Sequence, residues 1–267
     1  MNPSVISMAT NILDQYVHSA PSDQNALDIF KGEWSAELPE PYAHLTAGKV
    51  NLFADARVAW FLKEYGDITG QSILELGPLE GAQSYLLEQA GAGSVLAIEA
   101  NTKAYLRCLV LKEILRLKNV RYLCGDFTRY LQSTDQHFQL VFASGILYHM
   151  MNPMEVLANL ARISSSVFIW THYYEPAIVA QHQGIRNRFR AAERQTFGGY
   201  RYSQYRYHYE DALNWGGFCG GSSAYSYWLT RDDILGGLRH FGFRNIVTSF
   251  EEPNHPAGPA LALIARK

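Results

Sequence analysis

The chain has 267 residues, enough to bury one large α/β core, and its hydrophobic content of 48% and charged content of 18% are those of an ordinary globular protein. A formal net charge of −2 excludes the strongly basic character typical of nucleic-acid-binding proteins. No apolar run approaches the roughly 18 residues of a membrane span, and no secretory leader pattern opens the chain. Cys108, Cys124 and Cys219 form no C-x-x-C pair, so we expect buried thiols in a cytoplasmic protein that does not bind membranes.

The first fifty residues have the pattern of a helical extension that precedes the main domain. Residues 5–18 show helical apolar spacing, and a stretch rich in Pro, Glu and Gly follows at 21–41. Residues 51–65 carry a broad apolar face and end at Gly66, which predicts a helix leading into the core. We therefore assign residues 1–50 to an N-terminal helical extension.

Short apolar runs alternate with helical patterns from residue 72 onward. This alternation indicates right-handed crossovers between parallel strands. Two last apolar runs, parted by a turn rich in Pro and Gly, predict a closing antiparallel hairpin. The prediction is an α/β fold with a doubly wound, mostly parallel, seven-stranded sheet. Its strands are expected at 72–76, 94–100, 120–124, 140–144, 166–170, 244–252 and 259–267, with helices at 82–90, 102–117 and 153–163.

Two helix starts carry recognisable caps. Asn152, Pro153 and Glu155 supply a cap, a first-turn proline and a first-turn carboxylate in order. Thr230 and Asp233 repeat the capping-box spacing, which predicts another helix there.

One long region between Thr171 and Thr230 interrupts the alternation. It is dense in Tyr, Arg, Gly and His, a composition that disordered segments avoid. We interpret 174–227 as a lid inserted into a core formed by 51–173 and 228–267, placed to cover a ligand crevice at the carboxyl edge of the sheet. Within it, arginines interleave with tyrosines, a pattern suited to anionic substrates or stacked bases, although a packed, solvated lid has the same composition. The candidate substrate-binding residues here are Arg201, Tyr205, Arg206 and His208.

The stretch "ELGPLEG", from Glu75 to Gly81, follows the first strand. Dinucleotide folds place G-x-G-x-x-G at this turn, but here only Gly77 and Gly81 remain. The Glu75 carboxylate would repel a pyrophosphate, whereas it suits the ammonium group of an amino acid. Glu99 ends the next strand, where a carboxylate can accept the hydroxyl groups of a ribose. Downstream, Asp126 can accept from an adenine amine and Phe127 can stack on the base. Ribose, adenine and an amino-acid tail together describe S-adenosylmethionine.

The segments "ELGPLEG", "IEA", "GDF" and "VFASGILYH" resemble the successive motifs of class I S-adenosylmethionine-dependent methyltransferases over roughly residues 70–170. The resemblance implies a Rossmann-like methyltransferase fold that binds S-adenosylmethionine and releases S-adenosylhomocysteine. Leu79 departs from the usual E-x-G-x-G-x-G loop because it replaces the middle glycine. The resemblance assigns cofactor binding to Glu75, Gly77, Pro78, Gly81, Glu99, Ala100, Asn101, Asp126, Phe127 and Ser144.

Two histidines are candidate catalytic bases, because an ordinary imidazole titrates near the pH at which a base must work. His149 follows the fourth strand, where it either accepts a substrate proton or simply packs against the next helix. His172 follows the fifth strand, where it is either a base or an ordinary hydrogen-bonding group. The two have no accompanying carboxylate pattern, so we predict no metal. Tyr148, in the same segment, is a further candidate for substrate binding.

The segment "GILYHMMNP" also resembles the corresponding part of wobble-uridine tRNA carboxymethyl- and methyltransferases. Three functions therefore stay open. The first is methyl transfer to a small or medium-sized acceptor, at oxygen and with a histidine base, where the acceptor can be anionic. The second is tRNA modification, which the net charge of −2 disfavours. The third is adenosyl-cofactor binding without catalysis. An NAD-dependent enzyme ranks below all three.

Overall fold

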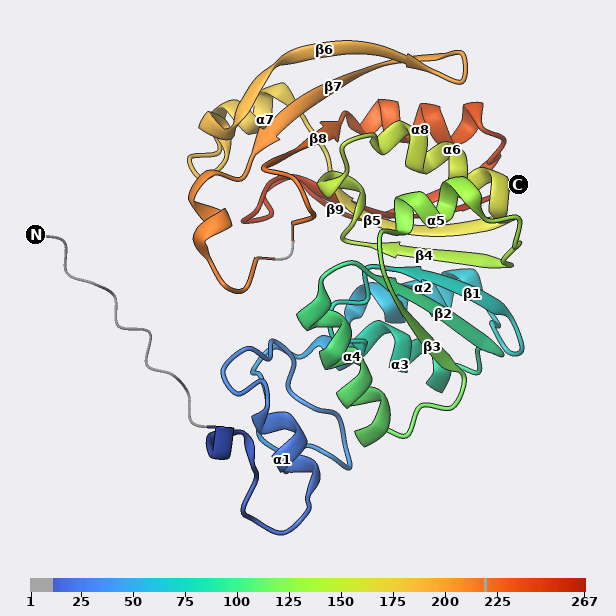
Figure 1. Ribbon diagram of the computed structural model, residues 1–267. Helices are drawn as coiled ribbons and strands as arrows, with labels where there is room; N and C mark the ends of the chain where they lie inside the picture. The colour runs from blue at the N-terminus through green and yellow to red at the C-terminus, as the bar shows by residue number, and fades with distance from the viewer. Residues whose placement is uncertain (1–11, 219) are drawn as a thin grey trace, which may run out of the picture.

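The computed structural model describes residues 12–218 and 220–267. Its centre is a seven-stranded sheet in the order β3-β2-β1-β4-β5-β10-β9 (Figure 1). Strands β1 to β5 are parallel, with Glu75 of β1 opposite Ala97 of β2 and Phe142 of β4. The strands span β1 Ser72–Leu76, β2 Ser94–Glu99, β3 Val120–Cys124, β4 Leu140–Ser144, β5 Ser166–His172, β9 Asn245–Glu252 and β10 Ala260–Arg266. The predicted doubly wound sheet is confirmed.

The closing hairpin is also confirmed. Strand β10 runs antiparallel to β5, with Leu263 opposite Ile169, and antiparallel to β9, with Leu263 opposite Thr248. The alternation of side chains along each strand supplies apolar residues to both faces of the sheet. As a result the sheet is buried on both sides, which is the usual condition of a parallel sheet.

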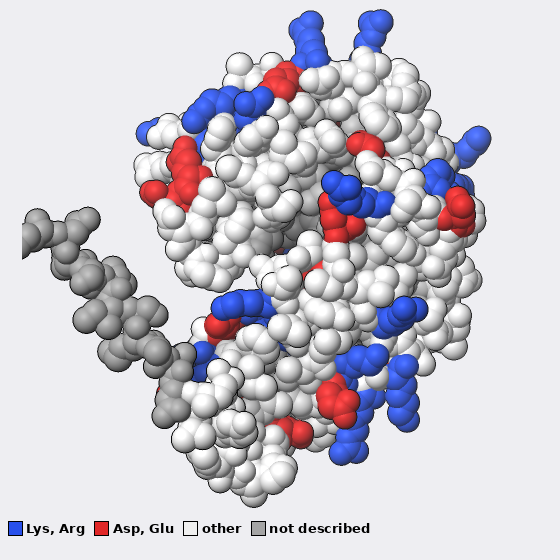
Figure 2. All heavy atoms as spheres, in the orientation of Figure 1, with Lys and Arg blue, Asp and Glu red and all other residues white. Residues whose placement is uncertain are grey.

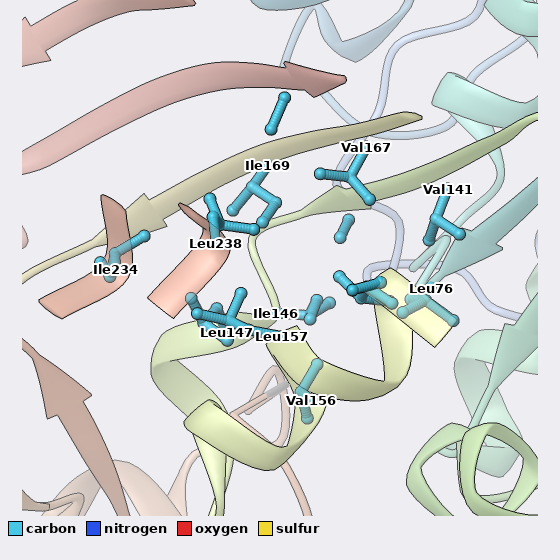
Figure 3. Packing of buried hydrophobic residues seen from close by; sticks show 14 of the residues in the cluster. Leu76, Val141, Ile146, Leu147, Val156, Leu157, Val167, Ile169, Ile234 and Leu238 are labelled. Carbon is cyan, nitrogen blue, oxygen red and sulfur yellow. The ribbon is translucent and has the colours of Figure 1, made fainter. Parts of the chain in front are cut away.

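Helices cover the two faces in separate layers. One face packs against α5 Phe127–Ser133, α6 Pro153–Ile163 and α8 Arg231–His240, through a cluster that includes Leu76, Ile146 and Leu238 (Figure 3). The other face packs against α2 Ala56–Tyr65, α3 Ala82–Gln89 and α4 Thr102–Ile114. Short helix α1 Asp23–Asp28 joins the second layer through buried Leu27. Single 3-10 turns occur at η1 Ile12–Gln15, η2 Leu52–Ala54 and η3 Leu147–His149.

The region between β5 and α8 forms its own small sheet, with strands in the order β6-β7-β8. Its elements are α7 Pro176–Gln181, η4 Arg186–Arg188, β6 Phe189–Phe197, β7 Tyr200–His208, η5 Glu210–Asn214 and β8 Tyr225–Leu229. This sheet lies above α8 in Figure 1 and has a small aromatic core around Tyr207, Tyr209 and Trp228. The inserted sheet is the element that breaks the strand-helix alternation of the sequence.

The predictions for helix caps, cysteine burial and the N-terminal helix are confirmed only in part. Thr230 caps α8 by accepting from the Asp233 N–H, as its spacing predicts. Asn152 stands at the start of α6 but makes no capping bond with its side chain, so that expectation is wrong. Cys108 is buried, whereas Cys124 is exposed because it lies at the end of edge strand β3, and Cys219 falls outside the described residues. Of the predicted helix at 5–18, residues 5–11 lie outside the described part and 12–15 form only a 3-10 turn.

No helix in the described residues has both the length and the apolar character needed to cross a bilayer.

Candidate functional site

A cavity of about 730 Å³ opens at the carboxyl ends of β1, β2 and β4. This is the edge where parallel α/β sheets bind ligands, at the point where the strand order reverses. The volume falls in the range of about 300–1,000 Å³ that is usual for cofactor and small-ligand sites. In Figure 2 the surface is hollowed between the part that contains β6 and β7 and the N-terminal part below it. The predicted residues Gly77, Pro78, Glu99, Ala100, Asn101, Phe127, Ser144, Tyr148 and His149 all line this cavity.

The loop between β1 and α3 keeps its glycine-like path although its middle glycine is missing. Gly77, Leu79 and Gly81 all have positive φ angles, of 68°, 58° and 84°. A Cβ atom at Gly77 would lie 2.8 Å from Ile146 Cγ2, and one at Gly81 would collide with the phenol oxygen of Tyr122. Leu79 tolerates the left-handed conformation at a cost on the order of 1 kcal/mol. Its N–H donates to Glu99 Oε2 at 3.0 Å, which fixes the turn.

Glu99 closes this loop from the end of β2. Its second oxygen, Oε1, accepts from the Asn101 N–H at 2.8 Å. Burial raises the pKa of Glu99, although the N–H groups of Asn101 and Leu79 counteract part of that rise. Each carboxylate oxygen keeps a further lone pair for a ligand hydroxyl.

Glu75 lies beneath the loop rather than in the lining of the cavity. Its side chain is 1% exposed, and one oxygen accepts from the Ser84 hydroxyl. The other oxygen, Oε1, has no hydrogen-bond partner within the described residues. Burial, with a smaller contribution from the nearby Glu99 charge, raises the pKa of Glu75 to about 7 against the hydrogen bond from Ser84. An unpaired buried carboxylate oxygen beneath the glycine loop suits a cationic group such as an ammonium.

Asp126 and Phe127 start α5 and face different surroundings. Phe127 is buried and lines the cavity, where its ring can pack on a base. Asp126 is exposed, and its Oδ1 accepts from the N–H and hydroxyl of Thr128 at the start of the helix. The structure therefore places Asp126 as a helix cap outside the cavity lining.

His149 and Tyr148 form an aromatic wall after β4. The ring centroids of the two residues are 4.0 Å apart. Nδ1 of His149 lies 2.7 Å from the phenol oxygen of Tyr209, which belongs to the inserted region. Burial, followed by the nearby imidazole of His172, lowers the pKa of His149 to about 3. The imidazole is therefore neutral throughout the ordinary pH range.

His172 is placed behind this wall and does not line the cavity. The ring stacks on Trp228 with centroids 5.2 Å apart and is 3% exposed. Its Nδ1 lies 2.8 Å from the Gly258 carbonyl oxygen, so this nitrogen carries the proton and donates it. Burial and the neighbouring His255 lower the pKa of His172 to about 4. The described residues contain no group of three or more His, Cys, Asp or Glu arranged to hold a metal.

The cavity residues that the sequence did not indicate include a connected group formed by Asp55, Arg57, Gln83 and Trp170. Asp55 accepts three hydrogen bonds from the Arg57 guanidinium, which lies 4.3 Å over the ring of Trp170. Gln83 Nε2 donates to both Asp55 Oδ2 and Ser144 Oγ, each at 3.1 Å. Burial alone would raise the pKa of Asp55, but the bonds and charge of Arg57 outweigh it and hold that pKa below its usual value. The only sequence signal was Asp55 as a helix cap, which carries no functional information.

The predicted substrate residues of the insertion do not line the cavity. Arg206 donates to Glu193 and to the Tyr227 hydroxyl, and Tyr205 stacks on Tyr174 at 3.5 Å, so both serve the small sheet. Arg201 is exposed on β7, and His208 lies beside Tyr225. Among the described residues of the insertion, those that reach the cavity are Phe218, Gly221 and Ser222.

Comparisons with known proteins agree with this architecture. Residues 74–166 match the family model described as methyltransferase domain. That range spans the positive-φ loop, Glu99, Phe127, Ser144 and His149, which are residues of the cavity just described. The chain contains a class I S-adenosylmethionine-dependent methyltransferase domain.

Relatives of this methyltransferase domain differ in how much of the chain they cover. A tRNA U34 carboxymethyltransferase of Ectopseudomonas mendocina (strain ymp) is 35% identical over 94 residues, which are 35% of this chain and 29% of that relative. The chain therefore matches less than a third of that curated relative's length.

Solved structures that resemble the whole chain show its fold. The N-terminal domain of EvdMO1, solved in the presence of S-adenosylhomocysteine and D-fucose, has a TM-score of 0.66 and 22% identity and covers 91% of this chain and 94% of its own. Magnesium protoporphyrin IX methyltransferase from Synechocystis PCC 6803, with bound S-adenosylhomocysteine, has a TM-score of 0.54 and 17% identity. The match covers 92% of this chain and 100% of that chain. An S-adenosylmethionine-dependent methyltransferase from Mesorhizobium loti has a TM-score of 0.55 and 15% identity, and the match covers 81% of this chain and 100% of that chain.

Proposed function

We propose that this chain methylates an oxygen of a small, neutral, hydroxyl-bearing acceptor, with His149 as the base. The observation that carries the proposal is the neutral His149 ring in the wall of the cavity, oriented by Tyr209. S-adenosylmethionine, when bound, supplies an electrophilic methyl group that the acceptor oxygen displaces from sulfur.

The loop residues fit this cofactor. A side chain at Gly77 or Gly81 would collide with Ile146 or Tyr122, so the loop backbone stays bare at both positions, and Glu75 Oε1 lies unpaired beneath it. We assign the ammonium of the amino-acid tail to this corner. We assign the ribose hydroxyls to Glu99, which has lone pairs to spare, and the adenine to the space between Phe127 and the backbone at Ala100 and Asn101.

His149 suits proton removal although its pKa is low. The hydroxyl of the acceptor becomes far more acidic as its oxygen gains a bond to carbon, so a weak neutral base is sufficient at that moment. With the Nδ1 proton donated to Tyr209, the lone pair of His149 lies on Nε2. His149 would then receive the hydroxyl proton, while the neighbouring rings of Tyr148 and Trp170 exclude water.

The charges of the cavity favour a neutral acceptor over an anionic one. In the described residues, the lysine and arginine that line the cavity are Lys103 and Arg57. Lys103 pairs with Glu33 at 3.0 Å and Arg57 pairs with Asp55 at 2.7 Å, so each cation already faces a carboxylate that would repel an anion. Hydroxyl groups can instead share the Asp55, Arg57 and Gln83 network as donors or acceptors. The sugar present with the EvdMO1 domain is a molecule of this kind.

Two measurements test the proposal in order. Thermal unfolding with S-adenosylmethionine, S-adenosylhomocysteine and NAD comes first, since a ligand at about 100 times its Kd stabilises a fold by roughly 2.7 kcal/mol. We expect both adenosyl ligands to raise the Tm of the wild type and NAD to leave it unchanged. In Glu99→Ala, we expect the adenosyl ligands no longer to raise the Tm. Transfer of a labelled methyl group to panels of neutral sugars and alcohols and of matched carboxylates and phosphates comes second. Methylation of the anionic panel alone would contradict a neutral acceptor.

The second candidate is a tRNA-modifying methyltransferase, favoured by the local identity of 35% with the tRNA U34 carboxymethyltransferase. Figure 2 shows Lys and Arg interspersed with Asp and Glu on one face rather than a continuous basic surface, which weighs against it. Labelled methyl incorporation into total tRNA distinguishes the two. Binding of the adenosyl ligands with no transfer to any small molecule or tRNA would favour a third candidate, a non-catalytic cofactor-binding protein.

A further inference from the structure

The cofactor loop is joined to a distant N-terminal segment through one buried side chain. Glu80, in the middle of "GPLEG", is 1% exposed. Its Oε1 accepts from the Ser35 N–H at 2.8 Å and its Oε2 accepts from the Ala36 N–H at 3.0 Å. Both oxygens of a loop carboxylate are thus used to hold backbone that lies about 45 residues earlier.

An arginine compensates the charge at this junction. Arg107 Nε lies 3.5 Å from Glu80 Oε1, and its Nη1 lies 3.7 Å from Glu33 Oε2. A buried carboxylate is costly unless a cation and hydrogen bonds satisfy it, and here both are provided. Removing the Glu80 charge would leave the Ser35 and Ala36 N–H groups and the Arg107 guanidinium without this partner.

The N-terminal segment that Glu80 binds continues along the chain to the cavity. Ala36 pairs with Val50 in a short parallel bridge, and Gly48 packs so closely on Ser35 that a Cβ atom would collide with its carbonyl group. Directly after this bridge, Leu52, Asp55 and Arg57 line the cavity. The segment 34–57 therefore supplies one wall of the site.

The wall is bound to the region of the cofactor loop at a second point. Gln83, in the first turn of α3, donates to Asp55 of the wall and to Ser144 of β4. Glu80 and Gln83 are three residues apart in the chain, so one short turn holds the wall at both ends. Any change in the path of the turn displaces the wall with it.

We propose that Glu80 is a positioning residue that couples the cofactor loop to the wall formed by residues 34–57. Cofactor binding then orders the wall, and an ordered wall strengthens cofactor binding by the same factor. This inference rests on the cofactor part of the proposed function and not on the identity of the acceptor.

Hydrogen exchange and titration calorimetry with S-adenosylhomocysteine test the coupling without any acceptor. In the wild type, we expect the ligand to slow amide exchange over residues 33–57. Glu80→Gln replaces one acceptor oxygen by a donor, so we expect the ligand Kd to rise about tenfold and the slowing over 33–57 to disappear. With S-adenosylmethionine and an acceptor, the KM for the cofactor should rise while kcat stays the same.

Gln24→Ala is the matched control. Gln24 binds both the N–H and the carbonyl of Thr46 and so braces the same segment, but it does not touch the loop. We expect it to lower Tm while leaving the ligand Kd within about twofold. Glu80→Asp, which keeps the charge, should give an intermediate Kd and serves if Glu80→Gln does not fold.

Two results would overturn the inference alone. One is a Glu80→Gln Kd equal to that of the wild type, and the other is an equal rise in Kd for Glu80→Gln and Gln24→Ala, which would reflect general loss of stability. If the wild type itself does not bind S-adenosylhomocysteine, the proposed function is wrong, and this inference, which depends on cofactor binding, is wrong as well.

Discussion

Nδ1 of His149 and the phenol oxygen of Tyr209 lie 2.7 Å apart although 60 residues separate them in the chain. His149 comes from the core, immediately after β4, whereas Tyr209 follows β7 in the inserted sheet. The insertion therefore reaches the candidate base directly.

Tyr209→Phe should reduce methyl transfer without weakening cofactor binding. Loss of the hydroxyl frees the His149 ring to rotate or change tautomer, so we expect kcat to fall roughly tenfold, the value of one hydrogen bond of about 1.4 kcal/mol. The KM for S-adenosylmethionine should be unchanged. Tyr207→Phe is the control, because Tyr207 belongs to the same aromatic core but its hydroxyl accepts from Arg188. Equal losses of kcat in the two variants would show that only packing matters.

His149→Gln should lower kcat by about 10²- to 10⁴-fold, the usual value of a general base. Because the pKa of His149 is lowered to about 3, protonation of this residue should not limit kcat in the wild type between about pH 5 and 8. The pH–rate profile checks both statements. His172→Gln is the comparison, because His172 lies behind the aromatic wall and does not line the cavity. A larger loss of kcat in His172→Gln than in His149→Gln would mean that His172 is the base.

Glu75→Gln should stabilise the ligand-free protein at alkaline pH. The pKa of Glu75 is raised to about 7 in the fold, so the unfolded chain loses this proton near pH 4.5 while the folded protein keeps it until about pH 7. The free energy of unfolding therefore falls as pH rises across this window, by about 3 kcal/mol at roughly 1.4 kcal/mol per pKa unit.

Denaturant unfolding of Glu75→Gln and the wild type at several pH values measures this difference. The two proteins should be similar at about pH 4.5, and the variant should be the more stable at about pH 8. Glu113→Gln, at an exposed position of α4, should show the wild-type pH dependence. Curves for Glu75→Gln that follow the wild type at every pH would mean that Glu75 is ionised in the fold throughout.

Gly81→Ala should destabilise the fold by roughly 2–3 kcal/mol, because strain at positive φ adds to a collision with Tyr122. Gly70→Ala isolates the strain, since Gly70 has a φ of 72° with nothing within 4 Å of an added Cβ. We expect Gly70→Ala to cost about 1 kcal/mol in chemical denaturation. Adding Tyr122→Phe to Gly81→Ala should recover part of the loss, and no recovery would exclude the phenol oxygen as the obstacle.

The sheet could be predicted because its signal is local. Five strand runs carry enough apolar residues for both faces, and helical patterns between them leave only parallel crossovers. Glu99 and Phe127 were also predictable, because strand ends of a parallel sheet meet at one edge. These residues line the cavity as that rule requires.

What could not be predicted depends on contacts far apart in the chain. The caps at Asp55 and Asp126 have the same sequence signal, yet Asp55 reaches the cavity and Asp126 faces solvent. The basic and aromatic pattern around Arg206 indicated substrate binding, but its partners Glu193 and Tyr227 come from the two neighbouring strands. Strand pairing of this kind does not appear in composition or spacing.

Leu79 changes how such a cofactor loop should be recognised. Three residues of the turn have positive φ, and a leucine adopts the middle one while its N–H donates to Glu99. A search that demands three glycines would discard this protein although all three loop positions have positive φ. Recognition by backbone conformation, together with a carboxylate at the end of the second strand, would retain it and would extend to relatives in which asparagine or aspartate occupies the same place.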